Sequence, residues 1–521
     1  MSLRGSSRTE ATSQGESRIA RLSLIPLVLL PLVALLAPIP AAAQETSPSQ
    51  TPSQTPTPST QTITTPGTQP RVLGPDGRPI LGPDGKPFVP ATPPPPSQTR
   101  IPGAYDTSII PTGAPRFTFT PSLTLAEQWT DNFFLVEKGR TDNFRTSLTL
   151  GLALLMNLPN TQGSLSTGLS GVYDTAPDDQ NFNFFPTFTA SILHTFTPRL
   201  TLTISDSFRR DDDPFLADPN GLRTTRDTFV QNTFAISLNW LVDVYQLQFY
   251  YRNVLFLPDE GSSTISNIIG GNVSMPVGAL NTLTGGYEFT FREGETTNDE
   301  FGQRVYGSFT RQIGTYTNVG VSSSFSWIMN NNDNGNDSRI WNISLTGSHG
   351  IPTGFSVSAR VGYSLFDSER GDPSHLFSTS VDASYRFARG VISAGFFQDF
   401  RQTADEGEDF GIVATRAVFA NASYSFTPFI TGTVHATYSR NEPVQGGGST
   451  SAPSTILTAG ANISWLITNW LSASLAYLYI DRDRDRSTNI GSNSIDTSRI
   501  PAQFLQSSTE NRATLTLSAS F

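Results

Sequence analysis

In several stretches of the sequence, apolar and polar residues alternate one by one. The charged residues that could bind a ligand stand at the polar positions, among serine, threonine and other small polar residues. Between 355 and 365, apolar residues alternate with small polar ones, and Arg360 stands on the polar side. The same alternation between 377 and 387 places Asp382 and Arg386 on the polar side. Ten such residues are assigned to one inner, pore-lining surface: Arg252, Glu288, Arg292, Arg304, Arg360, Asp382, Arg386, Asp399, Arg401 and His435.

This inner surface combines arginines with serine, threonine, asparagine, glutamine and glycine. Guanidinium groups form strong paired hydrogen bonds with acidic groups, and hydroxyl and amide side chains can hydrogen-bond sugars without holding them tightly. The pattern therefore favours a passage for hydrophilic or acidic chains. The alternative is that these residues solvate the wall and pair only with one another.

The remaining candidate residues do not form a reactive site. The four histidines (His194, His349, His375 and His435) are scattered without the spacing of a metal site, and the chain has no cysteine. No Gly-x-Ser-x-Gly elbow is present. The expectation is a protein without metal, cofactor or catalytic activity.

Acidic clusters occur in the polar stretches, at 211–213, 331–337 and 405–409. They could gather divalent cations, but none completes the twelve-position calcium loop, so we expect solvated loops. The run 481–486 alternates Asp and Arg and is expected to extend from a loop into solvent.

Strands must position these residues, because the apolar period is two. The segment 513–521 alternates without a fault, which predicts a strand. Its aromatic end at Phe521 resembles the closing strand of bacterial outer-membrane barrels. Short turns alternate with long polar loops from 116 onward, and aromatic residues such as Phe355, Trp465 and Trp470 stand near strand ends. The sequence predicts an all-β fold over 116–521: a transmembrane up-and-down antiparallel β-barrel of about 18–20 strands, the estimate resting on the turn spacing.

A membrane location then requires closure of the barrel. No apolar run after the leader approaches the roughly 20 residues of a membrane helix, and open sheet edges cannot be satisfied in lipid. A soluble sandwich is the alternative, but it would not place aromatic residues so regularly at strand ends.

Two segments precede the predicted barrel. Residues 1–43 carry arginines, the apolar run 22–36 and Ala41-Ala42-Ala43, which predicts a cleaved signal peptide. Residues 44–115 hold about half of the 37 prolines and an eight-residue unit repeated at 72–79 and 80–87. They predict a disordered periplasmic linker, either a plain spacer or an arm that binds peptidoglycan or a partner.

The opening strand carries a resemblance to a known family. Pro121-Ser-Leu-Thr-Leu, followed by Trp129-Thr-Asp-Asn-Phe-Phe, resembles the first strand of a family of outer-membrane β-barrel porins, some of which occur with exopolysaccharide secretion systems. The resemblance implies a bacterial outer-membrane location and a barrel over 116–521. It does not account for the Pro-rich linker.

Together these features predict a passive outer-membrane conduit for polysaccharide export or uptake. A general diffusion porin for small solutes and a docking protein with a plugged barrel remain as alternatives. The expected partners are outer-membrane lipid, lipopolysaccharide and the barrel assembly machinery, with periplasmic polysaccharide-export components or peptidoglycan at the linker. The net charge of −10 argues against nucleic acid.

Overall fold

The computed structural model describes most of the segment predicted to form the barrel. The described residues are 116–176, 181–217, 226–259, 263–294, 299–330, 337–369, 373–402, 412–444, 453–484 and 507–521. The predicted signal peptide and linker, 1–115, lie outside them, as do the acidic stretches 331–336 and 405–409.

Twenty strands and one short helix make up the described chain. The first half comprises β1 (Phe117–Thr130), β2 (Asn143–Leu158), β3 (Thr161–Asp174), β4 (Phe182–Thr197), β5 (Leu200–Asp211), the helix α3 (Pro214–Ala217), β6 (Phe229–Val242), β7 (Tyr245–Pro258), β8 (Thr264–Pro276), β9 (Asn281–Gly294) and β10 (Glu300–Gly314). The second half comprises β11 (Thr317–Asn330), β12 (Ser338–Gly350), β13 (Phe355–Ser368), β14 (Ser374–Phe387), β15 (Gly390–Gln402), β16 (Ile412–Ser425), β17 (Ile430–Pro443), β18 (Ser454–Leu466), β19 (Leu471–Arg484) and β20 (Ser508–Ser520).

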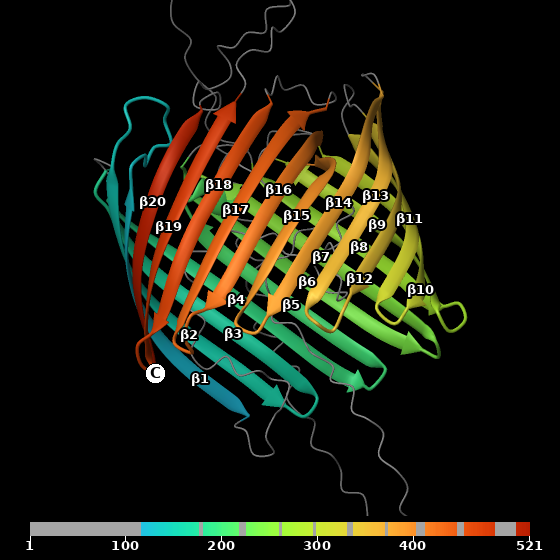
Figure 1. The fold of residues 1–521 in the computed structure, drawn as a ribbon, viewed down its shortest axis with the longest axis horizontal. Helices are drawn as coiled ribbons and strands as arrows, with labels where there is room; N and C mark the ends of the chain where they lie inside the picture. Colours follow the sequence, from blue (N-terminus) through green and yellow to red (C-terminus); the bar gives the residue numbers. More distant parts are fainter. Residues whose placement is uncertain are drawn as a thin grey trace, which may run out of the picture. The chain divides into compact units, whose positions relative to one another are not determined.

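The strands form one closed barrel. Each strand pairs with the next along the chain in antiparallel fashion, and β1 pairs with β20, so the sheet has no edge. Figure 1 shows the strands following one another around the wall in the order of the sequence. The predicted all-β, up-and-down antiparallel barrel is confirmed, at the upper end of the predicted strand number.

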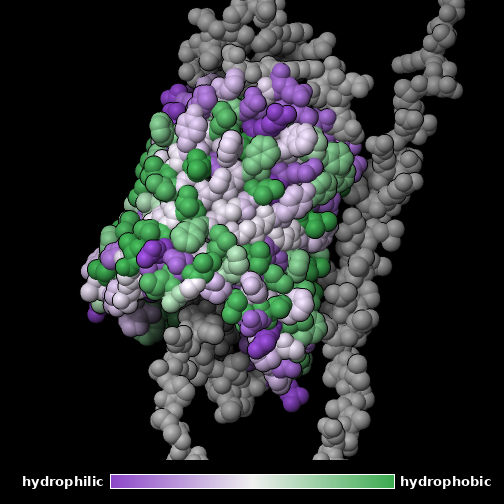
Figure 2. All heavy atoms as spheres, turned by 90° about the vertical axis from the view of Figure 1, so that its right-hand side faces the viewer, coloured by the Kyte–Doolittle hydropathy of each residue, from purple (hydrophilic) through white to green (hydrophobic). Residues whose placement is uncertain are grey.

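The alternation of the sequence separates an inner from an outer face. At the seam, Leu125 stands opposite Leu517, and Thr124 stands opposite Ser518. Leu125 and Leu517 are 48% and 44% exposed, whereas Ser518 is 6% exposed. Because the apolar partners are exposed and the hydroxyl partners are half-buried or buried, the wall is apolar outside and polar inside. In Figure 2 hydrophobic and weakly polar residues cover much of one outer face, and hydrophilic ones gather mainly near its upper and lower edges.

The two rims differ in their connections. At the short-turn rim, where β20 ends (the lower rim in Figure 1), tight turns join the strands. One of them needs Gly354, whose φ is +97° and whose added Cβ would lie 2.2 Å from the Arg386 carbonyl oxygen. The connections at the other rim, here called the long-loop rim, include all the undescribed internal stretches.

Two segment boundaries depart from the sequence prediction. The motif 129–134, assigned to the opening strand by its resemblance, is strand only as far as Thr130, because the chain turns there through Asn132 and Leu135, whose φ is +57°. The run 481–486, predicted to extend from a loop into solvent, lies partly in a strand, since β19 continues to Arg484. Arg482, expected in solvent, is only 3% exposed. Within the described residues, no helix has the length and apolar character of a membrane span.

Candidate functional site: the lumen and the long-loop rim

Pairs of small hydroxyl side chains line the inner face in the middle of the barrel and toward the short-turn rim. The Oγ atoms of Ser322 and Ser344 are 2.8 Å apart, and those of Ser356 and Ser384 are 2.7 Å apart. At the seam, Thr124 Oγ1 lies 2.8 Å from Ser518 Oγ. Each pair joins neighbouring strands across the ladder. The inner wall there is a surface of short side chains that can each donate and accept hydrogen bonds.

All ten residues assigned to the inner surface lie on the polar side of their strands. They are distributed over β7 (Arg252), β9 (Glu288 and Arg292), β10 (Arg304), β13 (Arg360), β14 (Asp382 and Arg386), β15 (Asp399 and Arg401) and β17 (His435). They do not form one site. The structure brings together three small groups on separate parts of the wall.

The first group spans β7 to β10. The Tyr250 hydroxyl donates to Glu288 Oε2 over 2.6 Å, and Arg304 stands opposite Glu288 in the ladder. Tyr250 can reach across β8 because Gly270 leaves room; a Cβ there would lie 2.3 Å from the tyrosine ring. Arg304 places its guanidinium 5.1 Å from the ring centre of Tyr306.

The other two groups are ion pairs. Arg292 Nη1 lies 2.6 Å from Glu300 Oε2, where β9 and β10 meet at the long-loop rim. Asp399 accepts hydrogen bonds from Ser378 over 2.9 Å and Ser364 over 3.2 Å, and it lies 3.4 Å from Arg360. In both groups, charged residues of the inner wall pair with one another. This is what we expect if these residues stabilise the wall and do not bind a cargo.

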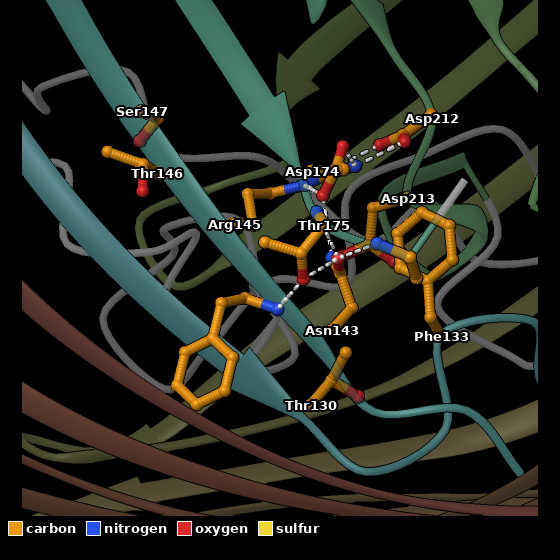
Figure 3. A network of polar contacts seen from close by, with 12 residues as sticks. Thr130, Phe133, Asn143, Arg145, Thr146, Ser147, Asp174, Thr175, Asp212 and Asp213 are labelled. Carbon is orange, nitrogen blue, oxygen red and sulfur yellow. Dashed lines mark hydrogen bonds and ion pairs between the residues drawn. The ribbon is translucent and has the colours of Figure 1, made fainter. Parts of the chain in front are cut away.

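The most developed polar site lies elsewhere, where the connection after β5 meets the inner wall. We call residues Asp212–Ala217 the mouth segment. Asp212 Oδ2 lies 2.5 Å from Arg145 Nη2 on β2, and Asp213 Oδ2 lies 2.5 Å from Arg512 Nη1 on β20. Figure 3 shows Arg145 held between Asp174 and Asp212. Two arginines from different strands thus hold consecutive carboxylates of the mouth segment.

Apolar contacts hold the other end of the mouth segment. Phe215, 4% exposed, packs against Ile456 on β18 and Ile480 on β19. Leu216 packs against the stacked rings of Phe229 and Phe256. Because Phe215 arises next to β5 and reaches β18 and β19, the mouth segment crosses part of the lumen.

A second layer fixes the arginines that hold the mouth segment. Arg145 also donates a hydrogen bond to Asp174, from Nε to Oδ1 over 2.8 Å. Arg512 Nη2 lies 3.0 Å from Glu510 Oε1, which also accepts a 2.9 Å hydrogen bond from Thr130. The result is a network that joins β1, β2, β3, β20 and the mouth segment. Buried charges of both signs with several hydrogen bonds each offset the cost of desolvation.

The charge state of the mouth segment follows from these partners. Burial alone would raise the pKa of Asp213, but the guanidinium groups of Arg512 and Arg226 outweigh it and hold that pKa well below its ordinary value of 3.8. Burial would likewise raise the pKa of Asp212, but the charge and hydrogen bonds of Arg145 lower it by more, so the pKa of Asp212 is also lowered. Both carboxylates are therefore ionised at neutral pH.

The long-loop half of the inner face is also less polar than the sequence prediction assumes. Ile328, Ile340, Phe366 and Leu376 lie near the long-loop ends of β11 to β14, face inward and form one buried cluster. Their outward neighbours, such as Trp341, are exposed. This cluster and the contacts of Phe215 give the long-loop half of the lumen an apolar lining on several strands.

The structure corrects one prediction about the acidic clusters. Asp212 and Asp213 were expected in a solvated loop, yet they are 8% and 7% exposed. The reason is the pairing with Arg145 and Arg512, which strand alternation alone does not reveal. The run Asp-Asp-Asp-Pro-Phe-Leu joins acids to apolar residues, and this mixture was the available signal for a loop that folds back onto protein. Among the described residues, no group of side chains has the composition of a metal site.

Among known proteins, only solved structures with a similar fold were found for this chain. No family model and no curated protein matches the chain. Similar solved structures include the siderophore receptor PirA from Pseudomonas aeruginosa, at 11% identity and TM-score 0.43 over 77% of this chain and 80% of that one. The FrpB iron transporter from Neisseria meningitidis has 9% identity and TM-score 0.47 over 77% and 82%. Pseudomonas aeruginosa OpdK with vanillate has 10% identity and TM-score 0.38 over 77% and 99%.

Proposed function

We propose that this chain is a channel of the bacterial outer membrane that conducts hydrophilic chains, with polysaccharide as the cargo class. The observation that carries the proposal is the division of the wall: exposed apolar residues outside, paired hydroxyl groups inside. A closed barrel satisfies every backbone hydrogen bond within the wall, which is the requirement for crossing lipid with strands.

Aromatic residues at both ends of the strands support the membrane placement. Near the short-turn rim, Trp465, Trp470 and Phe521 are exposed, and Trp470 stacks on Phe521 with ring centres 6.0 Å apart. Toward the long-loop rim, Tyr363 and Tyr477 are exposed on the same outer face. Two such belts separated by aliphatic residues fit the two interfaces of a bilayer.

The lining of the lumen supports a saccharide cargo. Hydroxyl groups such as those of Ser322, Ser344, Ser356 and Ser384 are short and both donate and accept hydrogen bonds. Each can exchange its neighbour for a sugar hydroxyl at small net cost, because a typical hydrogen bond contributes only about 1 kcal/mol. Weak contacts at many positions let a chain enter and leave.

The mouth segment favours a second candidate, a docking protein with a closed barrel. Its buried ion pairs and the contacts of Phe215 hold polypeptide inside the long-loop half of the lumen. In the channel proposal the same segment narrows the passage. Lipopolysaccharide and the assembly machinery are the partners of the barrel in either case, and export components or peptidoglycan are those of the linker.

The test is single-channel conductance of the full-length mature protein in planar bilayers, with neutral and anionic polysaccharides added in turn. Openings that a polysaccharide blocks support the conduit. Openings indifferent to both polysaccharides favour general diffusion. A folded protein that never opens, even when the mouth segment is released by substitution, favours the docking protein.

A further inference from the structure

Two arginines stand side by side on the barrel wall toward the long-loop rim. Arg416 on β16 is directly opposite Arg440 on β17 in the antiparallel ladder. Both side chains are nearly half exposed. We call these two residues the arginine pair. Like charges directly opposite one another destabilise a sheet, so the pair calls for negative charge beside it.

The arginine pair faces away from the lumen. Val418 follows Arg416 by two positions, and Tyr438 precedes Arg440 by two, so all four side chains share one face of the sheet. Val418 and Tyr438 are exposed, whereas Thr415, on the other face of β16, is buried. The arginine pair therefore lies on the outer face, where the apolar part of these two strands ends.

The position along β16 gives the depth of the pair. The outward residues from Val418 to Tyr424 carry no charge, and Tyr424 lies next to the short-turn rim. Eight positions (424 − 416) separate Arg416 from Tyr424, which correspond to a height of about 20 Å at about 3.4 Å per residue and a tilt of about 40°. The apolar band of such a barrel is about 25 Å tall. Arg416 therefore lies near headgroup depth, and the strand spacing of about 4.8 Å with the same tilt leaves Arg440 within about 3 Å of that height.

The pair shares one carboxylate. Glu442 Oε1 lies 2.8 Å from Arg440 Nε, and Glu442 Oε2 lies 3.5 Å from Arg416 Nη2. The three side chains together carry one net positive charge, because two arginines face one glutamate. A guanidinium group has five N–H donors. Within the part of the chain that the structure describes, these contacts engage one nitrogen of each guanidinium, so the other donors are available to a ligand.

Another outward arginine shows a balanced arrangement. Arg339 on β12 stands directly opposite Asp367 on β13, and its guanidinium lies 6.0 Å from the ring centre of Trp327. There the protein supplies one carboxylate for one guanidinium. The arginine pair has a surplus positive charge beside the lipid, and anionic headgroups are attracted to such basic groups at a membrane surface.

We propose that the arginine pair binds a phosphate group of an outer-leaflet lipid, with lipopolysaccharide as that lipid. The inference rests on the membrane placement proposed above, in which the short turns face the periplasm. Guanidinium groups form charge-assisted, often bidentate hydrogen bonds with phosphate. The phosphate supplies the negative charge that offsets the repulsion within the pair. A lipid fits better than a soluble anion, because the apolar wall continues directly below the pair through Val418 and the exposed, directly opposed Ala420 and Ala436.

Native mass spectrometry of the full-length mature protein in non-ionic detergent tests the ligand. The probes are the diphosphorylated lipid anchor of lipopolysaccharide, the same anchor without its phosphates, and inorganic phosphate. The unmodified protein is expected to bind the diphosphorylated anchor several-fold more tightly than the dephosphorylated one, and excess inorganic phosphate is expected to leave the anchor bound. Equal binding of the two anchors overturns the proposal. Displacement by inorganic phosphate overturns the assignment to a lipid.

Paired substitutions test the site. Arg416→Gln with Arg440→Gln is expected to weaken binding of the diphosphorylated anchor several-fold. The matched control, Arg311→Gln with Arg389→Gln, removes two exposed arginines toward the short-turn rim and is expected to leave binding unchanged. An equal loss in both variants, or no loss in either, overturns this proposal alone. Absence of the unmodified chain from outer membranes overturns the membrane placement as well.

Discussion

The two halves of the lumen are built on different principles. The half at the long-loop rim resembles a protein core: the mouth segment is fixed by ion pairs from Arg145 and Arg512, and Phe215 lies on Ile456 and Ile480. The half at the short-turn rim carries hydroxyl pairs such as Ser356 with Ser384, and has no comparable apolar cluster among the described residues. One half holds polypeptide in place, and the other presents a surface to solvent.

In the proposed channel, this difference indicates where passage is controlled. Packed cores and buried charge networks have few arrangements of similar energy, so they fix a segment in one position. Short hydroxyl side chains impose no such order. Passage through the barrel should therefore depend on the mouth segment and hardly on any single hydroxyl pair.

The largest effect is expected from Arg512→Ala. The change leaves Asp213 and Glu510 without the guanidinium that joins them, and removing one partner of a buried ion pair costs about 3–5 kcal/mol. Because the cost falls on a local contact, we expect release of the mouth segment from an intact barrel. Limited proteolysis between β5 and β6 measures it as faster cleavage.

A matched arginine provides the control for that experiment. Arg416 pairs with Glu442 at 3.5 Å, but its side chain is 45% exposed. Arg416→Ala is expected to change stability by about 1 kcal/mol or less. Equal protection of the β5–β6 connection in both variants would mean that the ion pairs do not fix the mouth segment.

A slightly smaller effect is expected from Phe215→Ala. Truncation of a buried phenylalanine costs about 3 kcal/mol through lost contacts and the cavity left behind. The ion pairs of Asp212 and Asp213 remain, so the segment should loosen at one end only. Single-channel recordings should show longer or more frequent openings than the unmodified chain. Phe215→Leu, which keeps most of the apolar contact, should stay close to the unmodified protein; a similar change in both variants would contradict the packing role.

Acid should release the mouth segment in a defined range of pH. The pKa values of Asp212 and Asp213 are lowered in the folded protein, so their contribution to stability is fully present above the ordinary value of 3.8 and is lost as pH falls toward the lowered values. Conductance should be constant from neutral pH to about pH 5 and rise only in stronger acid. A rise centred between pH 6 and about pH 7, where histidine titrates, would contradict this assignment.

The smallest effect is expected in the short-turn half. Ser384→Ala removes one partner of a 2.7 Å hydroxyl pair on the inner wall, and one such hydrogen bond contributes about 1 kcal/mol or less. Thermal stability and proteolysis of the β5–β6 connection should be unchanged within error. A loss comparable to that of Arg512→Ala would mean that both halves of the lumen are held as cores.

The fold was accessible from the sequence because it depends on local pattern. Alternation of the kind seen at 513–521 fixes a strand and its two faces, and an antiparallel order follows from short connections. The placement of Arg360, Asp382 and Asp399 on the polar side of their strands needed nothing more. Strand ends were less accurate. β1 stops early, at Thr130, because the chain turns after it. β19 continues to Arg484, because polar residues can extend a strand beyond its apolar stretch.

The mouth segment was not accessible in the same way. Its contacts join residues hundreds of positions apart, such as Asp213 and Arg512, and no local rule pairs them. The triple acid was assigned to solvent because its partners lie on other strands. Likewise, Arg416 and Arg440 could be placed side by side on the outer face only once the register of β16 and β17 was known.

Single-channel conductance of the full-length protein, unmodified and with Arg512→Ala, tests the central claim most directly. A channel narrowed by the mouth segment predicts brief or small openings for the unmodified chain and larger, stable openings for the variant. The opposite result would be a variant whose mouth segment is shown to be released by proteolysis, in a correctly folded barrel, that conducts no better than the unmodified chain. The lumen would then not be a passage controlled at the long-loop rim.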